Sequence, residues 1–220
     1  SRVLHSPLIY SLDRVIWNYQ FPKEQMRRVL ARELEEGDRR VLNAPCGRGG
    51  DFQYIEGLAG YICGLDLAPR AVVRAQERQD SVVGDMLNMP YPSETFDAVV
   101  CPLFFHHFVA YGFDTFLQEF YRVTRQGGKV VILEPSVFYP LNVVTRPLKR
   151  LFNNPYDEVE DERPFRPSLL VDGLKRAGYQ AVRFRAATFS HPAFFVPVAR
   201  AVNRLTSALL DLPVLARFGW

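Results

Sequence analysis

The chain has 220 residues, 48% of them hydrophobic, and a formal net charge of only +3. That length and hydrophobic content allow one sizeable core, so we expect a single α/β domain over residues 1–220. Three cysteines without C-x-x-C spacing argue against a disulfide framework and against a zinc knuckle. No segment reaches the roughly 18 uninterrupted apolar residues of a membrane span. The sequence therefore predicts a soluble, cytoplasmic protein.

From residue 40 onward, short β-branched runs alternate with helical stretches, a pattern that predicts an open, mostly parallel, Rossmann-like sheet with helices on both faces. Strands are expected at 40–44, 60–65, 81–84, 96–102, 128–134 and 179–186, and helices at about 21–36, 50–57, 69–78, 113–125 and 167–177. Pro69 and Pro167 favour the first turns of two of these helices. Gly127 and Gly128 are expected to end the helix at 113–125, and Gly178 the helix at 167–177.

Two stretches lie outside this alternation. Residues 137–165 are rich in proline and asparagine, and they predict a connecting excursion that serves as a cap or lid. Residues 189–220 carry apolar side chains at helical spacing with polar side chains opposite, which predicts an amphipathic helical segment. The apolar set is Val198, Ala201, Val202, Leu205, Leu209 and Leu212, and the polar set is Arg200, Arg204, Ser207 and Asp211.

A glycine-containing turn follows the first expected strand, as Pro45-Cys46-Gly47-Arg48-Gly49-Gly50. In an open α/β sheet the ligand lies beyond the carboxyl ends of the strands, where glycine lets the backbone approach it. Asp66, about 20 residues further on, can accept hydrogen bonds from ribose hydroxyls. The G-x-G-x-x-G spacing ends on Phe52 instead of glycine and no G-K-[ST] follows, so a pyrophosphate ligand is disfavoured. The turn therefore predicts a site for a nucleoside that carries an amino-acid tail.

Four stretches of the chain carry a resemblance to a known family. They are V-L-N-A-P-C-G-R-G-G at 41–50, G-L-D-L at 64–67, V-V-G-D-M at 82–86 with M-P-Y-P-S-E-T-F-D-A-V-V at 89–100, and F-L-Q-E-F-Y-R-V-T-R-Q-G-G-K-V-V-I-L-E-P at 116–135. Their order resembles the class I methyltransferases that depend on S-adenosyl-L-methionine, especially the subgroup with the ubiquinone and menaquinone methyltransferases. The resemblance spans about residues 40–186. It implies a cofactor-binding core at 40–136, between cap helices at 1–39 and a substrate-side region at 137–220.

The same resemblance implies roles for individual residues. Asp66 would hold the ribose of S-adenosylmethionine, and Asp85 would accept a hydrogen bond from the adenine amino group. The full set of implied cofactor contacts is Asn43, Ala44, Pro45, Cys46, Gly47, Gly49, Asp66, Leu67, Asp85, Met86 and Cys101. Each assignment has a plainer alternative, because Asp66 and Asp85 also suit turn caps, and Leu67 and Met86 also suit a hydrophobic core.

Two positions depart from the family pattern, which usually has an acid where Asn43 stands and glycine where Pro45 stands. Asn43 can still form hydrogen bonds, but it cannot offset the ammonium charge of the cofactor. Pro45 lacks a backbone N–H and has a fixed φ. These departures keep open a non-catalytic protein that binds S-adenosylmethionine or serves as a partner subunit.

Two adjacent histidines follow the strand expected at 96–102. A hydroxyl or carbon acceptor benefits from a base that removes its proton, and His106 and His107 are the candidates for this catalytic role. Because neighbouring side chains are expected to point apart, only one should face the acceptor, with a slight preference for His107. A structural role for both is equally open. An apolar pocket around them is expected from Phe104, Phe105 and Phe108.

Further candidates lie outside these motifs. Glu134 could orient a polar acceptor, Tyr10 and Tyr19 could close over the cofactor, and Arg163 or His191 could reach the site from the excursions.

The aromatic residues near the predicted site and in the tail favour an apolar small-molecule acceptor, such as a quinone, a lipid-linked compound or a natural product, methylated on oxygen or carbon. An RNA methyltransferase is an alternative, because residues 146–220 carry 12 basic and 7 acidic side chains. Basic and aromatic residues do not interleave, however, so no nucleic acid is expected. Basic residues beside apolar ones at 146–150 and on the C-terminal helix suggest peripheral membrane contact, with packing on the chain's own domain or on a second subunit as the alternative.

Overall fold

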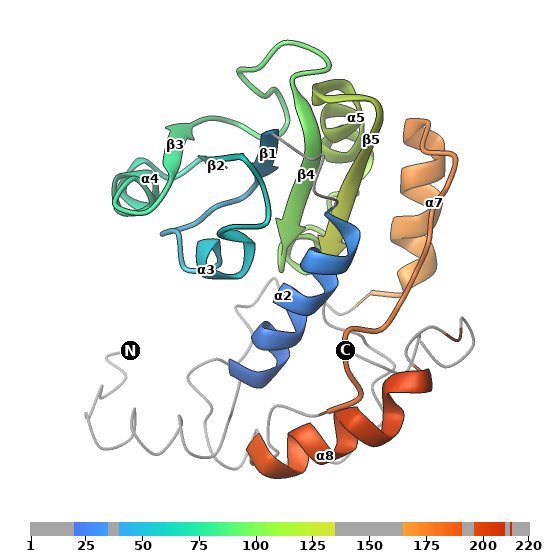
Figure 1. The fold of residues 1–220 in the computed structure, drawn as a ribbon. Coiled ribbons are helices and arrows are strands. Elements are labelled where there is room, and N and C mark those ends of the chain that lie inside the picture. Colours follow the sequence, from blue (N-terminus) through green and yellow to red (C-terminus); the bar gives the residue numbers. More distant parts are fainter. Residues whose placement is uncertain (1–19, 35–39, 135–164, 191–195, 210–211, 213–220) are drawn as a thin grey trace, which may run out of the picture. The chain divides into compact units, whose positions relative to one another are not determined.

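The computed structural model describes residues 20–34, 40–134, 165–190, 196–209 and 212 (Figure 1). The chain divides into two compact units. The sheet unit comprises Met26–Pro135 and Asp161–Arg183, and the second unit comprises Ser1–Gln25, Ser136–Glu160 and Phe184–Trp220. The expectation of one domain, with boundaries near residues 39 and 136, stays a prediction.

The sheet unit is built on five strands, β1 (Arg40–Asn43), β2 (Tyr61–Asp66), β3 (Asp80–Val83), β4 (Phe96–Pro102) and β5 (Thr124–Leu133). Their order is β3-β2-β1-β4-β5, and every neighbouring pair is parallel. The predicted parallel, Rossmann-like sheet is therefore confirmed. The order reverses between β1 and β4, and Asn43 lies opposite Gly64 of β2 and Val100 of β4. Because ligands of open α/β sheets bind at such a reversal, this edge is where a site is expected.

Four helices of the described chain lie within the sheet unit, namely α3 (Phe52–Ile55), α4 (Pro69–Ala75), α5 (Asp114–Val123) and α7 (Pro167–Ala177). The helix α2 (Gln20–Glu33) belongs to this unit from Met26 onward. A 3-10 turn, η1 (Phe105–His107), follows β4. The bounds predicted for α7 are confirmed, with Pro167 in its first turn and Gly178 after it at φ 111°. The predicted start of α4 at Pro69 is also confirmed.

Two predictions, one of a strand and one of a helix end, are wrong. Residues 179–186 form no strand, because their backbone pairs with none of the described strands despite the alternating side chains. Gly127 and Gly128 do not end a helix, since α5 already ends at Val123 and both glycines lie within β5. Gly128 is needed for close approach, because a Cβ there would lie 2.6 Å from the carbonyl oxygen of Asp97 in β4.

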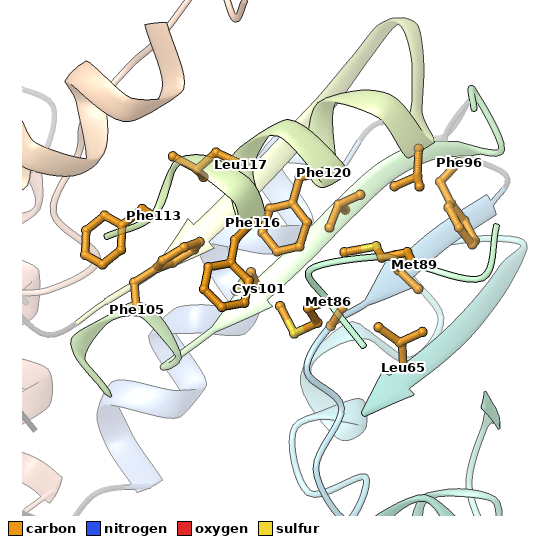
Figure 2. Close-up of a cluster of buried hydrophobic side chains, with 14 of the residues drawn as sticks. Leu65, Met86, Met89, Phe96, Cys101, Phe105, Phe113, Phe116, Leu117 and Phe120 are labelled. Carbon is orange, nitrogen blue, oxygen red and sulfur yellow. The ribbon is translucent and has the colours of Figure 1, made fainter. Parts of the chain in front are cut away.

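The hydrophobic core lies between α5 and one face of the sheet (Figure 2). Phe113, Phe116, Leu117 and Phe120 follow helical spacing and are all buried. Each phenylalanine buried in this way contributes about 1.5–3 kcal/mol to folding. Phe105 of η1 is 0% exposed and packs edge-on against Phe113, with ring centroids 4.9 Å apart. The core thus fixes the turn that carries the two histidines.

The opposite face of the sheet is also covered closely. Cys63 and Leu65 of β2 belong to the core beneath α5, so Gly64 between them faces the other way. A Cβ on Gly64 would lie 2.6 Å from Nε2 of Gln79, just past α4, and 2.9 Å from Cβ of Cys46. The chain after α4 and the turn after β1 therefore pack directly on β2, and the prediction of cover on both faces is confirmed.

In the second unit the chain is helical over α8 (Val196–Thr206), followed by a 3-10 turn, η2 (Ser207–Leu209). The side of α8 that is buried carries Ala199 and Asn203. Asn203 donates to Oε1 of Gln25 at 3.2 Å and accepts from the Thr188 hydroxyl at 3.0 Å. The predicted apolar set instead lies largely exposed, with Leu205 at 82%. No helix of the described residues is long and apolar enough to cross a membrane.

Candidate functional site

The turn after β1 is fixed by backbone hydrogen bonds to both neighbouring strands. The N–H of Ala44 donates to the carbonyl of Val100 at 3.0 Å, and that of Cys46 donates to the carbonyl of Leu65 at 2.9 Å. Gly49 has φ of 75°, and a Cβ on it would lie 3.1 Å from Cα of Ala75. Glycine at this position therefore serves both the backbone conformation and the close packing on α4.

Asp66 joins the turn to the end of β2. Its Oδ2 accepts from the N–H of Gly47 at 2.9 Å, and its Oδ1 accepts from the N–H of Ala68 at 2.9 Å. The turn-cap role is thus present. A carboxylate oxygen has two lone pairs, so each oxygen keeps capacity for one further donor, and the cap does not preclude a ribose contact. Leu67, the next residue, is 68% exposed at this edge.

The loop after β3 begins beside Asp66, because the N–H of Gly84 donates to the Asp66 carbonyl at 3.0 Å. Asp85 is exposed, and its Oδ1 accepts from the N–H of Leu87 at 2.8 Å. Met86 is 5% exposed and belongs to the core cluster. The plainer alternatives suggested by the sequence are therefore both present here, a local turn for Asp85 and core packing for Met86. Their adenine contacts stay predictions.

Asn43 is the unusual buried group of this edge. Its side chain is 0% exposed, and neither its Oδ1 nor its Nδ2 has a hydrogen-bond partner among the described residues. A buried polar group without a partner costs about 1–3 kcal/mol. The amide has an NH₂ group that can donate to the carboxylate and a carbonyl oxygen that can accept from the ammonium, so it fits the amino-acid tail of S-adenosylmethionine. The residues of the turn therefore fit the predicted cofactor.

The two cysteines of the site are neutral. Burial raises the pKa of the Cys46 thiol to about 11. Burial, reinforced by the charge of Glu134, raises the pKa of the Cys101 thiol well above its ordinary value. Because the thiolate is the nucleophilic form, neither side chain is suited to attack a substrate at neutral pH. Cys101 points into the core cluster, which leaves its backbone for the predicted contact.

The histidines lie in η1, and Glu134 holds this turn. Oε1 of Glu134 accepts from the N–H groups of Phe104 at 2.7 Å and Phe105 at 2.6 Å. Oε2 lies 2.7 Å from Nδ1 of His106, and the two side chains are 9% and 12% exposed. The rings of His106 and His107 lie side by side, with centroids 4.1 Å apart and planes at 37°. The expectation that they point apart is therefore wrong, because the tight turn stacks them.

The structure modifies the predicted aromatic pocket. Phe105 is fully buried in the core and cannot line a pocket. Phe104 and Phe108 are half-buried, with ring centroids 4.5 Å apart. The remaining candidates, Tyr10, Tyr19, Arg163 and His191, lie outside the described residues.

Sequence reasoning did not find the pair that Glu134 forms with His106. The two residues are 28 positions apart, and only the pairing of β4 with β5 brings them together. The available signal was that both follow the carboxyl ends of neighbouring strands. The slight preference for His107 as base stays a prediction, while the carboxylate contact belongs to His106.

Known proteins share sequence with this chain. Residues 42–132 of the chain match the methyltransferase domain family. The chain is 32% identical over 117 residues to a demethylmenaquinone methyltransferase of Deinococcus radiodurans, covering 49% of this chain and 48% of that protein. It is 34% identical over 116 residues to a phthiotriol/phenolphthiotriol dimycocerosates methyltransferase of Mycobacterium leprae, covering 48% and 42%. The chain thus spans about half the length of these relatives or less.

Solved structures show the same fold. A SAM-dependent methyltransferase from Thermotoga maritima superposes with a TM-score of 0.63 at 20% identity, covering 86% of each chain. One from Archaeoglobus fulgidus gives 0.59 at 21% identity, covering 85% of each. The predicted resemblance to class I methyltransferases of the menaquinone type is confirmed.

Proposed function

We propose that this chain transfers a methyl group from S-adenosylmethionine to an oxygen or carbon atom of an apolar small molecule. The observation that carries the proposal is the pair of polar groups at the reversal of the strand order. Asp66 ties the turn after β1 to β2 while keeping acceptor capacity, and the buried Asn43 amide at the end of the neighbouring β1 has no protein partner among the described residues. A nucleoside with an amino-acid tail satisfies both.

Different residues of the chain contact different parts of the cofactor. Asp66 accepts from the ribose hydroxyls, Asp85 from the adenine amino group, and the exposed Leu67 packs on the adenine ring. Asn43 forms hydrogen bonds with the amino-acid tail. The backbone of Cys101 and of the turn borders this tail, and the turn residues are Ala44, Pro45, Cys46, Gly47 and Gly49. When bound, S-adenosylmethionine supplies an electrophilic methyl group on its sulfonium. The chain then has to align the acceptor, exclude water and accept a proton.

The relatives support an apolar acceptor. Their names describe methylation of demethylmenaquinone and of phthiotriol dimycocerosates, a quinone and a lipid class. The half-buried rings of Phe104 and Phe108, next to His106 and His107, suit such a molecule. An RNA acceptor gains no support from these relatives.

We further propose that α8 contacts anionic membranes. Leu205 is 82% and Val198 48% exposed, and the exposed Arg200 and Arg204 lie on the same short helix. Apolar side chains flanked by arginine suit the boundary between acyl chains and anionic headgroups. An apolar acceptor of the proposed class would be met at such a surface.

Calorimetry tests the central proposal. The wild-type chain is titrated with S-adenosylmethionine and, separately, with S-adenosylhomocysteine, after circular dichroism has verified that it is folded. We expect saturable heat with both ligands. Asp172→Ala, at an exposed position on α7, is the matched control for the loss of a carboxylate in Asp66→Ala, and it should bind both ligands as the wild type does. Folded wild-type protein that gives no heat with either ligand overturns the proposal.

A further inference from the structure

We propose that Glu134 is a positioning residue that holds His106 with its Nε2 free to accept the proton of the methyl acceptor. This inference rests on the proposed methyl transfer. It assigns the base to His106, and it gives Glu134 a role in setting the protonation of the ring instead of contacting the acceptor.

The turn between β4 and η1 directs three donors at one carboxylate. Leu103 has φ of 53°, in the left-handed region that leucine rarely adopts, and its N–H donates to the carbonyl of Leu133 at 2.7 Å. This bend brings the N–H groups of Phe104 and Phe105 onto Oε1 of Glu134. Oε2 is left for His106, 2.7 Å from Nδ1. Backbone strain at such a point occurs where the surrounding structure fixes a functional geometry.

The carboxylate determines which ring nitrogen carries the proton. An ionised carboxylate only accepts hydrogen bonds, so Nδ1 of a neutral His106 must carry hydrogen and donate it to Oε2. Nε2, on the far side of the ring, then carries the lone pair. With the side chains of Glu134 and His106 only 9% and 12% exposed, little water competes for this bond. The ring is thereby held as a base in one tautomer.

The pair lies at the same sheet edge as the cofactor turn. His106 follows β4, Glu134 follows β5, and Asn43 ends β1, whose partner in β4 is Val100. The cofactor turn occupies the β1–β2 side of this edge, and the pair occupies the β4–β5 side. Ligands of open α/β sheets lie across this edge, so an acceptor between the two reaches both.

The proton step balances within the chain. The acceptor O–H bond breaks and its proton passes to Nε2 of His106. The electron pair stays on the acceptor, where it makes the oxygen or, in a hydroquinone, a conjugated ring carbon nucleophilic. The charge of Glu134 offsets the imidazolium that forms. The proton leaves to water after the product has departed, which restores the starting tautomer.

Nitrogen NMR of the unliganded protein tests the tautomer without any acceptor. Protein labelled with ¹⁵N at histidine is compared with His106→Asn, which identifies the His106 signals. We expect protonated Nδ1 and unprotonated Nε2 in the wild type. In Glu134→Gln the amide oxygen can still accept from Phe104 and Phe105, while its NH₂ group donates to Nδ1, so the proton should move to Nε2. A wild-type ring protonated at Nε2 alone, or an unchanged ring in Glu134→Gln, overturns the proposal.

Turnover is then measured with a prenylated 1,4-naphthohydroquinone as the probe acceptor. Glu134→Gln and His106→Asn should each lower kcat by about 10²–10⁴-fold, the usual contribution of a general base. The double variant should be no slower than the slower single variant, because the two residues act as one unit. Glu77→Gln, an exposed position just after α4, is the matched control and should leave kcat unchanged.

Two results separate this inference from the proposed function. Affinity for S-adenosylmethionine, measured by calorimetry, should change less than about threefold in Glu134→Gln and His106→Asn, since neither is placed at the cofactor. Full turnover of His106→Asn beside loss of turnover in His107→Asn assigns the base to His107 and overturns the inference alone. If the wild-type chain binds no cofactor, the proposed function is wrong. The NMR measurement of the His106 tautomer still tests the Glu134–His106 geometry independently.

Discussion

The amide of Gly47 donates to the carboxylate of Asp66 across 2.9 Å, and this bond joins the turn after β1 to the end of β2. The same carboxylate caps Ala68, the residue before α4. One side chain therefore shapes the turn and offers its remaining lone pairs to a ligand, so its structural and binding roles can be separated only by suitable substitutions.

Asp66→Ala should abolish detectable binding of S-adenosylmethionine, because the ribose acceptor is lost. It should also lower the free energy of unfolding by about 1–3 kcal/mol, since two N–H groups lose their partner. Asp66→Asn keeps one acceptor oxygen and should lose less stability. Calorimetry and urea unfolding measure the two effects. Normal binding by Asp66→Ala would show that the cofactor does not use this edge as proposed.

Gly64→Ala should destabilise the sheet unit by about 1–3 kcal/mol, the usual cost of overpacking. Its new Cβ would lie 2.5 Å from the Ser81 hydroxyl and 2.9 Å from Cβ of Cys46, so the turn after β1 must also shift. We therefore expect weaker cofactor binding as well. Gly50→Ala is the control for unfolding, because a Cβ there meets nothing within 4 Å. Equal unfolding midpoints in urea for the two variants would contradict the packing described here.

Glu119 and Arg122 clamp the loop that carries Asp85 and Met86. Glu119 accepts from the N–H of Met89 at 2.8 Å, and Arg122 donates to the carbonyl of Tyr91 at 2.7 Å. The hydrogen bond from Arg122, with that from Met89, lowers the pKa of Glu119 below its ordinary 4.5.

A lowered pKa in the folded state gives stability that is present above pH 4.5 and is lost as the pH falls below it. Glu119→Gln should therefore lose stability relative to the wild type at pH 7, and the difference should shrink towards pH 3. Urea unfolding across this range measures it, with Glu77→Gln as the exposed control. A difference that stays constant with pH would exclude an ionic contribution from the clamp.

Leu205→Asp tests the proposed membrane surface. The substitution places a charge on a side chain that is 82% exposed, so folding should be unaffected while flotation with anionic vesicles falls several-fold. Leu169→Asp, on the 41% exposed Leu169 of α7, is the matched control. Binding should weaken at high salt. If wild type, Leu205→Asp and Leu169→Asp float equally, α8 does not form the membrane contact.

Elements with strong local signals were predictable from the sequence. Pro167 and Gly178 bound α7 at the expected residues, because each has a fixed backbone preference at a helix end. Buried β-branched runs likewise revealed the five strands to within a few residues. The segment 179–186 failed because its alternation is a local property, whereas a strand also requires a hydrogen-bonding neighbour.

The candidate site was predictable where it follows the ends of strands in a fixed order. Asn43, Gly47 and Asp66 come together through the pairing of β1 with β2, as the parallel pattern implies. The contact of Glu134 with His106 was not predictable, since it depends on the bend at Leu103 and on the side-chain conformations of both residues. The sequence also could not show that Phe105 is fully buried in the core while Phe104 and Phe108 lie partly exposed against it.

The buried amide of Asn43 has a consequence for how the cofactor is held. Hydrogen bonds from a neutral amide inside the protein are not screened by dissolved ions, unlike the attraction between an exposed carboxylate and an ammonium. An acid at this position would bind partly through its charge, whereas the proposed contact of Asn43 with the cofactor uses an uncharged, buried amide. We therefore expect its affinity for S-adenosylmethionine to change little between low and high ionic strength.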